Sequence, residues 1–239
     1  MASGADVYLL HVTTTPSVSY VVATEDFDCG IMISASHNPY YDNGIKLING
    51  AGEKMEQEVI DEVEKYIDGL IPELPLAQRD EIGRTVDYSA GRNRYVGYLI
   101  SLARNSFKGM KVGLDCAHGS TWQIAKSVFD ALGAKTVVMG DAPDGLNINN
   151  GVGSTHLDAL QKMVVEQGLD LGFAFDGDAD RCLAVDENGN VVDGDAMMYI
   201  LGMRLKNRGM LNKDTVVATV MSNSGFFASL KRAGMEVDQ

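Results

Sequence analysis

Short apolar runs alternate with segments of helical period along most of the chain. The runs have the length of buried strands, and the segments between them repeat apolar residues three or four positions apart. This alternation is typical of sheets whose faces are covered by helices. The predicted strands are 7–12, 29–34, 45–48, 111–115, 135–139, 171–175 and 215–220. The predicted helices are one after Thr15, 55–67, 90–104, one after 119–121, one after Thr155, 195–206 and one after Gly225.

Capping and turn residues mark several ends of these elements. Thr15 and Pro16 supply an N-cap and a first helical residue, so we expect the first helix to begin there. Asn188-Gly189 separates the apolar runs 183–185 and 191–192, and this spacing predicts a β-hairpin with a type I′ turn.

One segment has the composition of a linker. Residues 72–84 hold two of the chain's five prolines and many charges, without an apolar period. We therefore divide the chain into domains at 1–88, 89–190 and 191–239. The fold class predicted is α/β, with tandem domains built on mixed, mostly parallel sheets, of which only the middle domain holds a full set of elements.

Composition and charge narrow the classes of function. With 45% hydrophobic residues over 239 positions, the chain can bury at least one large core. The formal net charge of -13 argues against a sequence-independent nucleic-acid binder and against a protein that binds anionic membranes, since both need a basic face. An anionic substrate would have to be attracted locally, by a bound cation or by a few placed Lys and Arg residues.

The cysteines and the hydropathy indicate a compartment. Cys29, Cys116 and Cys182 are far apart and lack the spacing of a zinc site or a redox pair, so we interpret them as reduced core thiols of a cytoplasmic protein. Residues 1–6 lack the basic region of a signal peptide, and no window approaches the roughly 20 apolar residues that cross a bilayer. We expect a soluble protein.

A polar loop, residues 34–39 (the serine loop), follows the predicted strand 29–34. Open α/β sheets bind their ligands at the carboxyl ends of strands. A serine there, such as Ser36, can be an attacking hydroxyl or a phosphate carrier, and His37 and Lys46 could supply proton transfer or charge stabilisation. Because Ser, Asn and Pro are also turn residues, an ordinary turn stays open as an alternative.

A second loop, residues 176–181 (the aspartate loop), follows the predicted strand 171–175. Its carboxylates, Asp176, Asp178 and Asp180, repel one another strongly unless a cation lies among them, and oxygen ligands favour Mg²⁺ or Ca²⁺. We interpret the loop as a metal site, with a solvated acidic loop as the alternative.

Three carboxylates leave a six-coordinate Mg²⁺ with open positions, which phosphates usually fill. A phosphorylated Ser36 would provide such an oxygen. The pattern then favours phosphoryl transfer, in which His37, Lys46 and Arg181 hold or protonate the oxygens of the moving group.

A calcium-binding module, from a different functional class, matches part of the same spacing. The three aspartates and Glu187 take positions 1, 3, 5 and 12 of an EF-hand loop. Position 6 requires Gly for a sharp turn but is Arg181, and the flanks are predicted as a strand and a hairpin where an EF-hand has two helices. We rank this alternative below the magnesium site.

The serine loop, the residues 40–46 that follow it (Tyr-Tyr-Asp-Asn-Gly-Ile-Lys) and the aspartate loop together resemble the α-D-phosphohexomutase family. The resemblance runs over essentially the whole chain. It implies that Ser36 is the phosphoserine and that the three aspartates bind Mg²⁺ together with its phosphate. It also implies acid/base and transition-state roles for Lys46 and His37.

Within the family, two segments resemble the branch that interconverts glucosamine 6-phosphate and glucosamine 1-phosphate through a bisphosphate intermediate. They are residues 34–46 and residues 144–149 (Asp-Gly-Leu-Asn-Ile-Asn) leading to 153–156 (Gly-Ser-Thr-His). Phosphomannomutases and phosphoglucomutases are the alternative. Gly151-Val152-Gly153 stands where this branch commonly has Gly-Cys-Gly, and we interpret 153–156 as an N-cap loop that takes no part in catalysis.

Parts of the family pattern do not occur in this sequence. They are the opening Gly-Thr-Asp-Gly motif, the sugar-recognising Gly-Glu-x-Ser-Gly-His loop and the C-terminal phosphate-binding domain. The resemblance therefore implies a piece of an intramolecular phosphotransferase with incomplete domains at 1–88 and 191–239, which we expect to be inactive alone. The implied partners are a hexosamine phosphate, a sugar bisphosphate and, for the full-length protein, a second copy in a homodimer. Nucleic acids and membranes are not among them.

Overall fold

The middle of the chain holds the largest sheet. Its elements are α3 (Ser89–Leu102), β5 (Lys111–Asp115), the 3-10 turn η2 (Ser120–Gln123), α4 (Ala125–Ala131), β6 (Lys135–Met139), α5 (Asp158–Gln167), β7 (Leu171–Phe175), β8 (Cys182–Asp186) and β9 (Val191–Val192). In the computed structural model, which describes all residues from Met1 to Gln239, the strand order is β6-β5-β7-β8-β9. β5 pairs in parallel with β6 and β7, whereas β8 is antiparallel to β7 and β9. The sheet is therefore mixed, as predicted.

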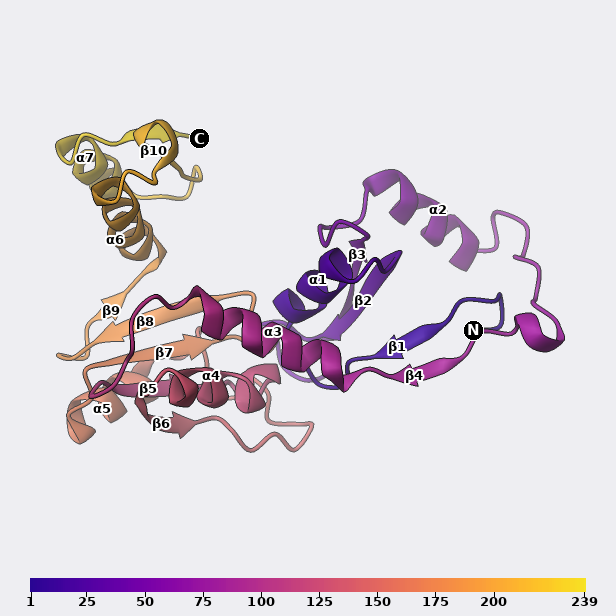
Figure 1. Cartoon of the computed structure of the whole chain (residues 1–239), viewed down its shortest axis with the longest axis horizontal. Helices are drawn as coiled ribbons and strands as arrows, with labels where there is room; N and C mark the ends of the chain where they lie inside the picture. Colours follow the sequence, from indigo (N-terminus) through magenta and orange to yellow (C-terminus); the bar gives the residue numbers. More distant parts are fainter.

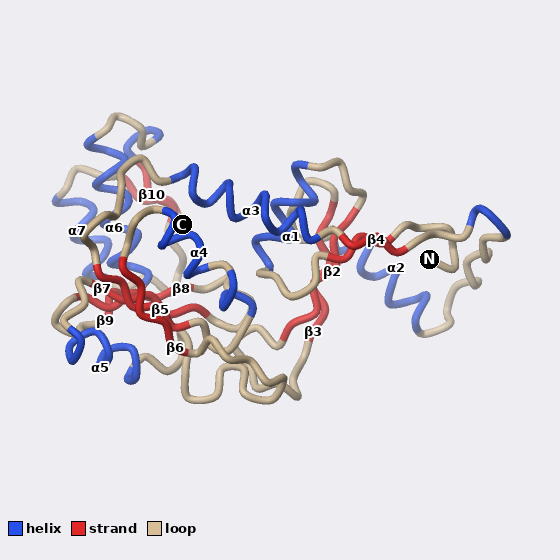
Figure 2. The backbone as a smooth tube through the Cα atoms, turned by 60° about the horizontal axis from the view of Figure 1, so that its bottom comes forward, coloured by secondary structure: helices blue, strands red, loops and turns tan.

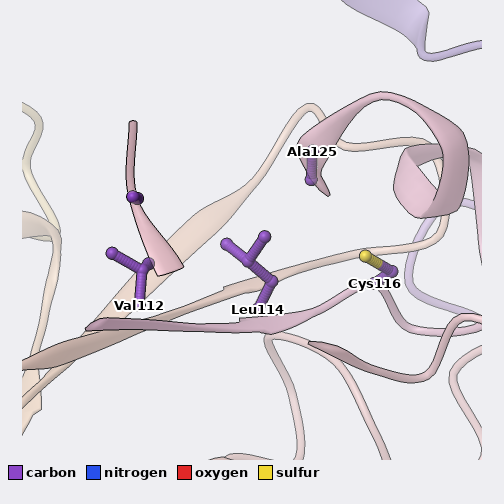
Figure 3. Close-up of a cluster of buried hydrophobic side chains, with 5 residues drawn as sticks. Val112, Leu114, Cys116 and Ala125 are labelled. Atoms are coloured by element: carbon purple, nitrogen blue, oxygen red, sulfur yellow. The ribbon is translucent and has the colours of Figure 1, made fainter. Parts of the chain in front are cut away.

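Alternating side chains of β5 form the two faces of this sheet. Val112, Leu114 and Cys116 are buried on one face, and Ala125 of α4 lies over them (Figure 3). Full burial of a Val or Leu side chain stabilises the fold by about 1.5–3 kcal/mol each. Gly113 points to the other face, where an added Cβ would lie 3.1 Å from the side chain of Leu169. The pleat thus gives each helix layer its own set of residues.

The second face is covered by α5. Leu160 and Val164, four residues apart on this helix, are both fully buried. At Gly172 of β7, a Cβ would lie 2.8 Å from each of these two side chains. A glycine at this position lets the helix lie close to the sheet. Leu160 therefore packs α5 directly against both β5 and β7.

The N-terminal part of the chain is built around α1. Its elements are β1 (Val7–Leu9), α1 (Thr15–Thr24), β2 (Cys29–Ser34), β3 (Gly44–Asn49), α2 (Gln57–Ile67), the 3-10 turn η1 (Arg79–Glu81) and β4 (Thr85–Asp87). β2 and β3 form an antiparallel pair, and α1 packs Val18 and Val22 against Ile48 of that pair. β1 and β4 form a separate parallel pair.

The C-terminal part holds α6 (Gly194–Asn207), the 3-10 turn η3 (Asn212–Asp214), β10 (Thr215–Val217), α7 (Ser224–Arg232) and β11 (Glu236–Asp238). Phe226 and Leu230 of α7 are buried in its core. Figure 1 shows the three parts arranged in series, with α3 between the N-terminal part and the central sheet. α3 packs on both α1 and α4, and Figure 2 shows the β2–β3 and β1–β4 pairs apart from the central strands.

Several predicted elements are confirmed, and others need correction. The strands 111–115, 135–139 and 171–175 have the predicted bounds. The N-cap of α1 is Thr14, whose hydroxyl accepts from the Ser17 backbone N–H, so the predicted cap is one residue late. The predicted hairpin around residues 188–189 is confirmed, but the predicted turn type, I′, is wrong. Only Gly189 has a positive φ there, and a type I′ turn needs two such residues.

Two short strands escaped prediction, β4 and β11. β4 lies directly after the segment 72–84 that was interpreted wholly as linker, and β11 has the sequence Glu-Val-Asp. β4 pairs in parallel with the distant strand β1, and β11 pairs in parallel with β10 on the other side of α7, so tertiary contacts define both strands. No helix in the structure combines the length and the apolar composition that crossing a bilayer demands.

Candidate functional site

The serine loop and the aspartate loop meet in space although they are far apart in sequence. The Ser36 hydroxyl donates to Asp176 Oδ2 at 3.2 Å, across 140 residues of chain. Carboxylate oxygens of Asp176, Asp178 and Asp180 all lie within 4.8 Å of one another. The serine loop follows β2 and the aspartate loop follows β7, so both stand at the carboxyl end of a strand, where the sequence predicted a site.

Backbone contacts fix the two loops together. The Gly177 N–H donates to the Ser36 carbonyl at 2.9 Å, and the Thr15 N–H donates to the Asp178 carbonyl at 2.9 Å. A Cβ at Gly177 would lie only 2.5 Å from the Ser36 carbonyl oxygen. The absence of a side chain at this position is therefore what allows the serine loop to approach the aspartate loop so closely.

Both loops hold a non-glycine residue in the left-handed region. Ser36 has φ 52° and Ala179 has φ 59°. Such a conformation costs on the order of 1 kcal/mol for a residue with a Cβ, and persists where the surrounding contacts determine it. Strain of this kind gathers at functional sites.

The electrostatics of the site centre on Asp178, which is fully buried. Lys46 Nζ lies 2.5 Å from Asp178 Oδ2 and 2.7 Å from Asp180 Oδ2. Burial favours the neutral carboxyl of Asp178, but its bonds to the Lys46 ammonium and the Thr15 hydroxyl outweigh this and lower its pKa. Burial also disfavours the charged form of Lys46, yet the two carboxylates outweigh it and raise the pKa of Lys46.

The pKa of Asp176 is shifted in the opposite direction from that of Asp178. Burial raises the pKa of Asp176, and the charges of Asp178 and Asp180 raise it further. Lys46 makes ion pairs with Asp178 and Asp180 and none with Asp176, so one carboxylate of the three has no cationic side chain beside it.

The arrangement fits a divalent cation held by oxygen. Asp178 Oδ1 is buried without a hydrogen-bond partner, although its other oxygen accepts from both Lys46 and Thr15. A buried carboxylate oxygen with no partner costs free energy unless a ligand satisfies it. Together with Asp176 and Asp180, this oxygen provides the hard, anionic ligands that Mg²⁺ prefers.

The EF-hand alternative lacks its flanking helices. The aspartate loop lies between the strands β7 and β8, and an EF-hand loop lies between two helices. Glu187, which would have to be the twelfth ligand, lies in the β8–β9 turn at the other end of β8 from Asp180. The spacing match is therefore a coincidence of sequence.

The structure places His37 and Arg181 at the margin of this group. The half-buried His37 ring makes no hydrogen bond, and its Nδ1 atom is buried without a partner. The Arg181 side chain is exposed, with Nε 3.9 Å from Asp180 Oδ1. Its backbone N–H donates to Asp176 Oδ1 at 3.1 Å. Ser36, Lys46 and the three aspartates are thus brought together directly, whereas the side chains of His37 and Arg181 border the group.

Two contacting residues escaped prediction from the sequence. The Thr15 hydroxyl bonds to Asp178, and the Asn149 amide bonds to the serine loop. Thr15 was assigned a capping role alone, and nothing in its sequence context points to the aspartate loop. Asn149 ends the segment 144–149, so that motif was the available signal.

Comparisons with known families and proteins agree with this geometry. Three profiles of phosphoglucomutase/phosphomannomutase α/β/α domains match the chain: domain I over residues 1–71, domain II over 93–189 and domain III over 193–239. The phosphoglucosamine mutases of Lachnoclostridium phytofermentans and Lachnospira eligens are 68% and 64% identical to it, over 96% and 100% of the chain. These matches cover 51% and 53% of the two relatives, so the chain spans about half their length.

A solved structure shows the same fold. The phosphoglucomutase/phosphomannomutase family protein of Burkholderia thailandensis superposes with a TM-score of 0.79 at 21% identity. The match covers 99% of this chain and 52% of that one. The predicted α/β fold class is confirmed.

Proposed function

Since the chain belongs to the phosphoglucomutase/phosphomannomutase family, we propose that it carries the phosphoserine and the metal ligands of a phosphoglucosamine mutase. The reaction is the interconversion of glucosamine 6-phosphate and glucosamine 1-phosphate. The observation that carries this proposal is the contact of the Ser36 hydroxyl with a cluster of three aspartates, one of which has a buried oxygen without a partner. The identity of 68% to a phosphoglucosamine mutase supports the choice of sugar.

Ser36 is the group that exchanges phosphoryl with the substrate. A sugar hydroxyl oxygen attacks the phosphorus of phospho-Ser36, the bond from phosphorus to Oγ breaks, and the proton of the attacking hydroxyl passes to a base. The sugar is then a bisphosphate. In the second half of the reaction Ser36 Oγ attacks the phosphorus of the other phosphate, the bond from that phosphorus to the sugar oxygen breaks, and the sugar oxygen takes up a proton. This restores phospho-Ser36 and releases the isomeric monophosphate.

Lys46 and His37 divide the supporting roles. The raised pKa of Lys46 keeps the ammonium charged near neutral pH, so we assign it to stabilising the negative charge of the transferring group. His37 adjoins Ser36 and holds an unpartnered ring nitrogen, so we assign it to proton transfer with the sugar hydroxyl. Exposed Arg181 is assigned to contact with phosphate oxygens from the margin of the site.

Asp176, Asp178, Asp180 and the phosphate of Ser36 would hold Mg²⁺. When bound, this ion neutralises charge on the transferring phosphoryl group. A fungal N-acetylphosphoglucosamine mutase with a TM-score of 0.65 to this chain, at 19% identity, has been solved in complex with GlcNAc-6P and magnesium. That similarity shows the fold, and it supports magnesium as the ion to test first.

We also propose a cellular compartment and an oligomeric state for the enzyme. We place it in the cytoplasm because its three cysteines are free. The homodimer of the full-length protein stays a prediction, as do the domain bounds 1–88, 89–190 and 191–239. A phosphomannomutase or phosphoglucomutase is the alternative activity, since the matching domain profiles carry both names.

A coupled assay on the full-length protein tests the proposal. Wild type should interconvert the glucosamine phosphates in the presence of Mg²⁺ and a bisphosphate activator, and peptide mass spectrometry should find phosphate on Ser36. Ser36→Ala should abolish turnover, whereas Ser127→Ala, a change on the exposed side of α4, should not. Faster turnover of mannose or glucose phosphates would favour the alternative. Phosphate on Ser34 with Ser36 unmodified would refute the assignment of the nucleophile.

A further inference from the structure

The side chain of Asn149 spans two parts of the chain. Its amide nitrogen lies 2.8 Å from the Ser36 carbonyl oxygen and 2.8 Å from the Asn38 carbonyl oxygen. An asparagine amide nitrogen carries two donors, so both are used on the serine loop. The residue is 7% exposed, and 113 residues separate it from Ser36. One buried amide therefore joins the loop after β2 to the segment after β6.

Ile148, the residue before Asn149, contacts the aspartate loop. Ile148 packs so closely on Gly177 that a Cβ there would lie 2.6 Å from Ile148 Cδ1. Gly177 in turn donates to the same Ser36 carbonyl that accepts from Asn149. The Ile148-Asn149 pair thus contacts the aspartate loop with one side chain and the serine loop with the next.

The backbone beneath Asn149 is firmly held. Its N–H donates to the Ala117 carbonyl at 2.9 Å. The fully buried Asp115 carboxylate, at the end of β5, accepts from the N–H groups of Ala117 at 2.9 Å and Gly153 at 2.7 Å. Asn149 itself has φ 57°, a left-handed conformation that asparagine tolerates better than most residues with a Cβ. The chain therefore needs at this position both a tolerated left-handed backbone and a two-donor side chain.

We propose that Asn149 is a positioning residue for the phosphoryl transfer of Ser36. It fixes the main chain of Ser36 in its left-handed conformation, which aims the hydroxyl at Asp176. This inference rests on the proposed function. The donors of Asn149 are used on two carbonyl groups, so it acts through the serine loop and has no contact with the reacting atoms. It also gives a role to the motif 144–149, which the catalytic roles above leave unused.

The expected effect follows from the geometry of transfer. A misplacement of about 1 Å at a reacting atom can cost on the order of 10²-fold in rate. Without the Asn149 amide, the Ser36 carbonyl keeps one donor, Gly177, and the Asn38 carbonyl loses the side-chain donor bonded to it. We therefore expect kcat to fall by about 10- to 100-fold, while KM for the sugar phosphate stays within about threefold.

Two variants of the full-length protein separate the amide from the backbone. Asn149→Gly keeps the left-handed conformation and deletes the donors. Asn149→Asp keeps the size but turns a carboxylate oxygen toward two carbonyl oxygens, so it should be at least as harmful. The matched controls are Asn150→Gly and Asn150→Asp, at the next position, which is exposed and whose side chain makes no hydrogen bond. Steady-state kcat and KM are measured for all four at a temperature where circular dichroism shows each to be folded.

The outcomes decide between positioning and mere stabilisation. A loss in kcat with unchanged KM in both Asn149 variants, and in neither control, supports positioning. Values of kcat within about twofold of the controls, or an increase in KM equal to the loss in kcat/KM, would overturn it.

Amide hydrogen exchange at Gly177, whose N–H donates to Ser36, gives a readout without catalysis. Asn149→Gly should accelerate this exchange by about tenfold over Asn150→Gly. If wild type neither carries phosphate nor turns over any sugar phosphate, the proposed function has failed, and equal exchange in the two variants would then refute positioning as well.

Discussion

Gly177→Ala is the smallest change that separates the serine loop from the aspartate loop. The new Cβ would lie 2.5 Å from the Ser36 carbonyl oxygen and 2.6 Å from Ile148 Cδ1. Gly177 does not occupy the left-handed region, so alanine suits its backbone and the perturbation is purely steric. The consequences of this substitution can therefore be attributed to crowding by the added methyl group against the serine loop and Ile148.

The magnitude follows from that distance. Ordinary contact begins at 3.4 Å, so the Ser36 carbonyl must retreat by about 0.9 Å from the added Cβ. The hydrogen bond of 2.9 Å from the Gly177 N–H would be lost or weakened in the same movement. Overpacking of this kind costs about 1–3 kcal/mol of stability. A displacement near 1 Å at Ser36 should also lower kcat on the order of 10²-fold.

Gly97→Ala is the matched control. Gly97 is an exposed residue inside α3, and a Cβ there meets nothing within 4 Å. Replacing a glycine in a helix interior with alanine stabilises by about 0.5–1 kcal/mol. Denaturant unfolding of both variants should therefore give changes of opposite sign, and the kinetic assay should show a loss for Gly177→Ala alone.

The two glycine variants should differ both in stability and in activity. An unfolding free energy for Gly177→Ala within about 0.5 kcal/mol of wild type would mean that the loops accommodate a methyl group easily. Full activity in a destabilised Gly177→Ala protein would mean that the position of Ser36 is set elsewhere. Either result would also weaken the role assigned to Asn149, because both arguments depend on close approach of the serine loop.

Three further changes test other parts of the structure. Lys46→Met removes the ammonium between Asp178 and Asp180 and leaves their charges unpaired, which should destabilise the protein by about 3 kcal/mol; partial exposure of Lys46 keeps the loss at the low end for a buried pair. Millimolar Mg²⁺ should restore much of this stability, and thermal unfolding with and without the ion measures both effects. Burial raises the pKa of Cys116 to about 12, so iodoacetamide at pH 8 should modify exposed Cys29 and leave Cys116 unmodified until the protein unfolds, as peptide mapping would show. Asp115→Asn leaves one buried N–H facing a second donor and should cost about 1–3 kcal/mol in denaturant unfolding.

The sequence predicts the central strands well because local pattern and burial agree there. Lys111–Asp115 and Leu171–Phe175 are apolar runs at the centre of a covered sheet, so the period of the pattern alone locates them. β11 is different, since Glu236–Asp238 has one apolar residue and becomes a strand through its pairing with β10. Register between distant strands is a tertiary property that no local window contains.

The residues of the candidate site also separate into those that the local sequence predicts and those that depend on tertiary contacts. Ser36 and Asp176 are predictable because each follows a strand, and the carboxyl ends of strands bind ligands. Asn149 and Thr15 are harder, because their contacts depend on how one part of the chain docks on another. The sequence therefore predicts which loops form the candidate site, and the tertiary structure adds the residues that fix those loops relative to one another.

In the proposed enzyme, the negative charge of the site would make binding of the cation and phosphorylation of Ser36 depend on one another. Phosphorylation of Ser36 would add about 1.5 to 2 negative charges beside Asp176, whose carboxylate has no basic partner. At an effective dielectric constant near 20, two unit charges 4 Å apart interact by about 4 kcal/mol, so repulsion in this site is large unless a cation offsets it. The net charge of -13 offers no remote compensation. Since coupling between two bound groups is reciprocal, any free energy by which Mg²⁺ stabilised phospho-Ser36 would equally tighten Mg²⁺ binding once Ser36 is phosphorylated.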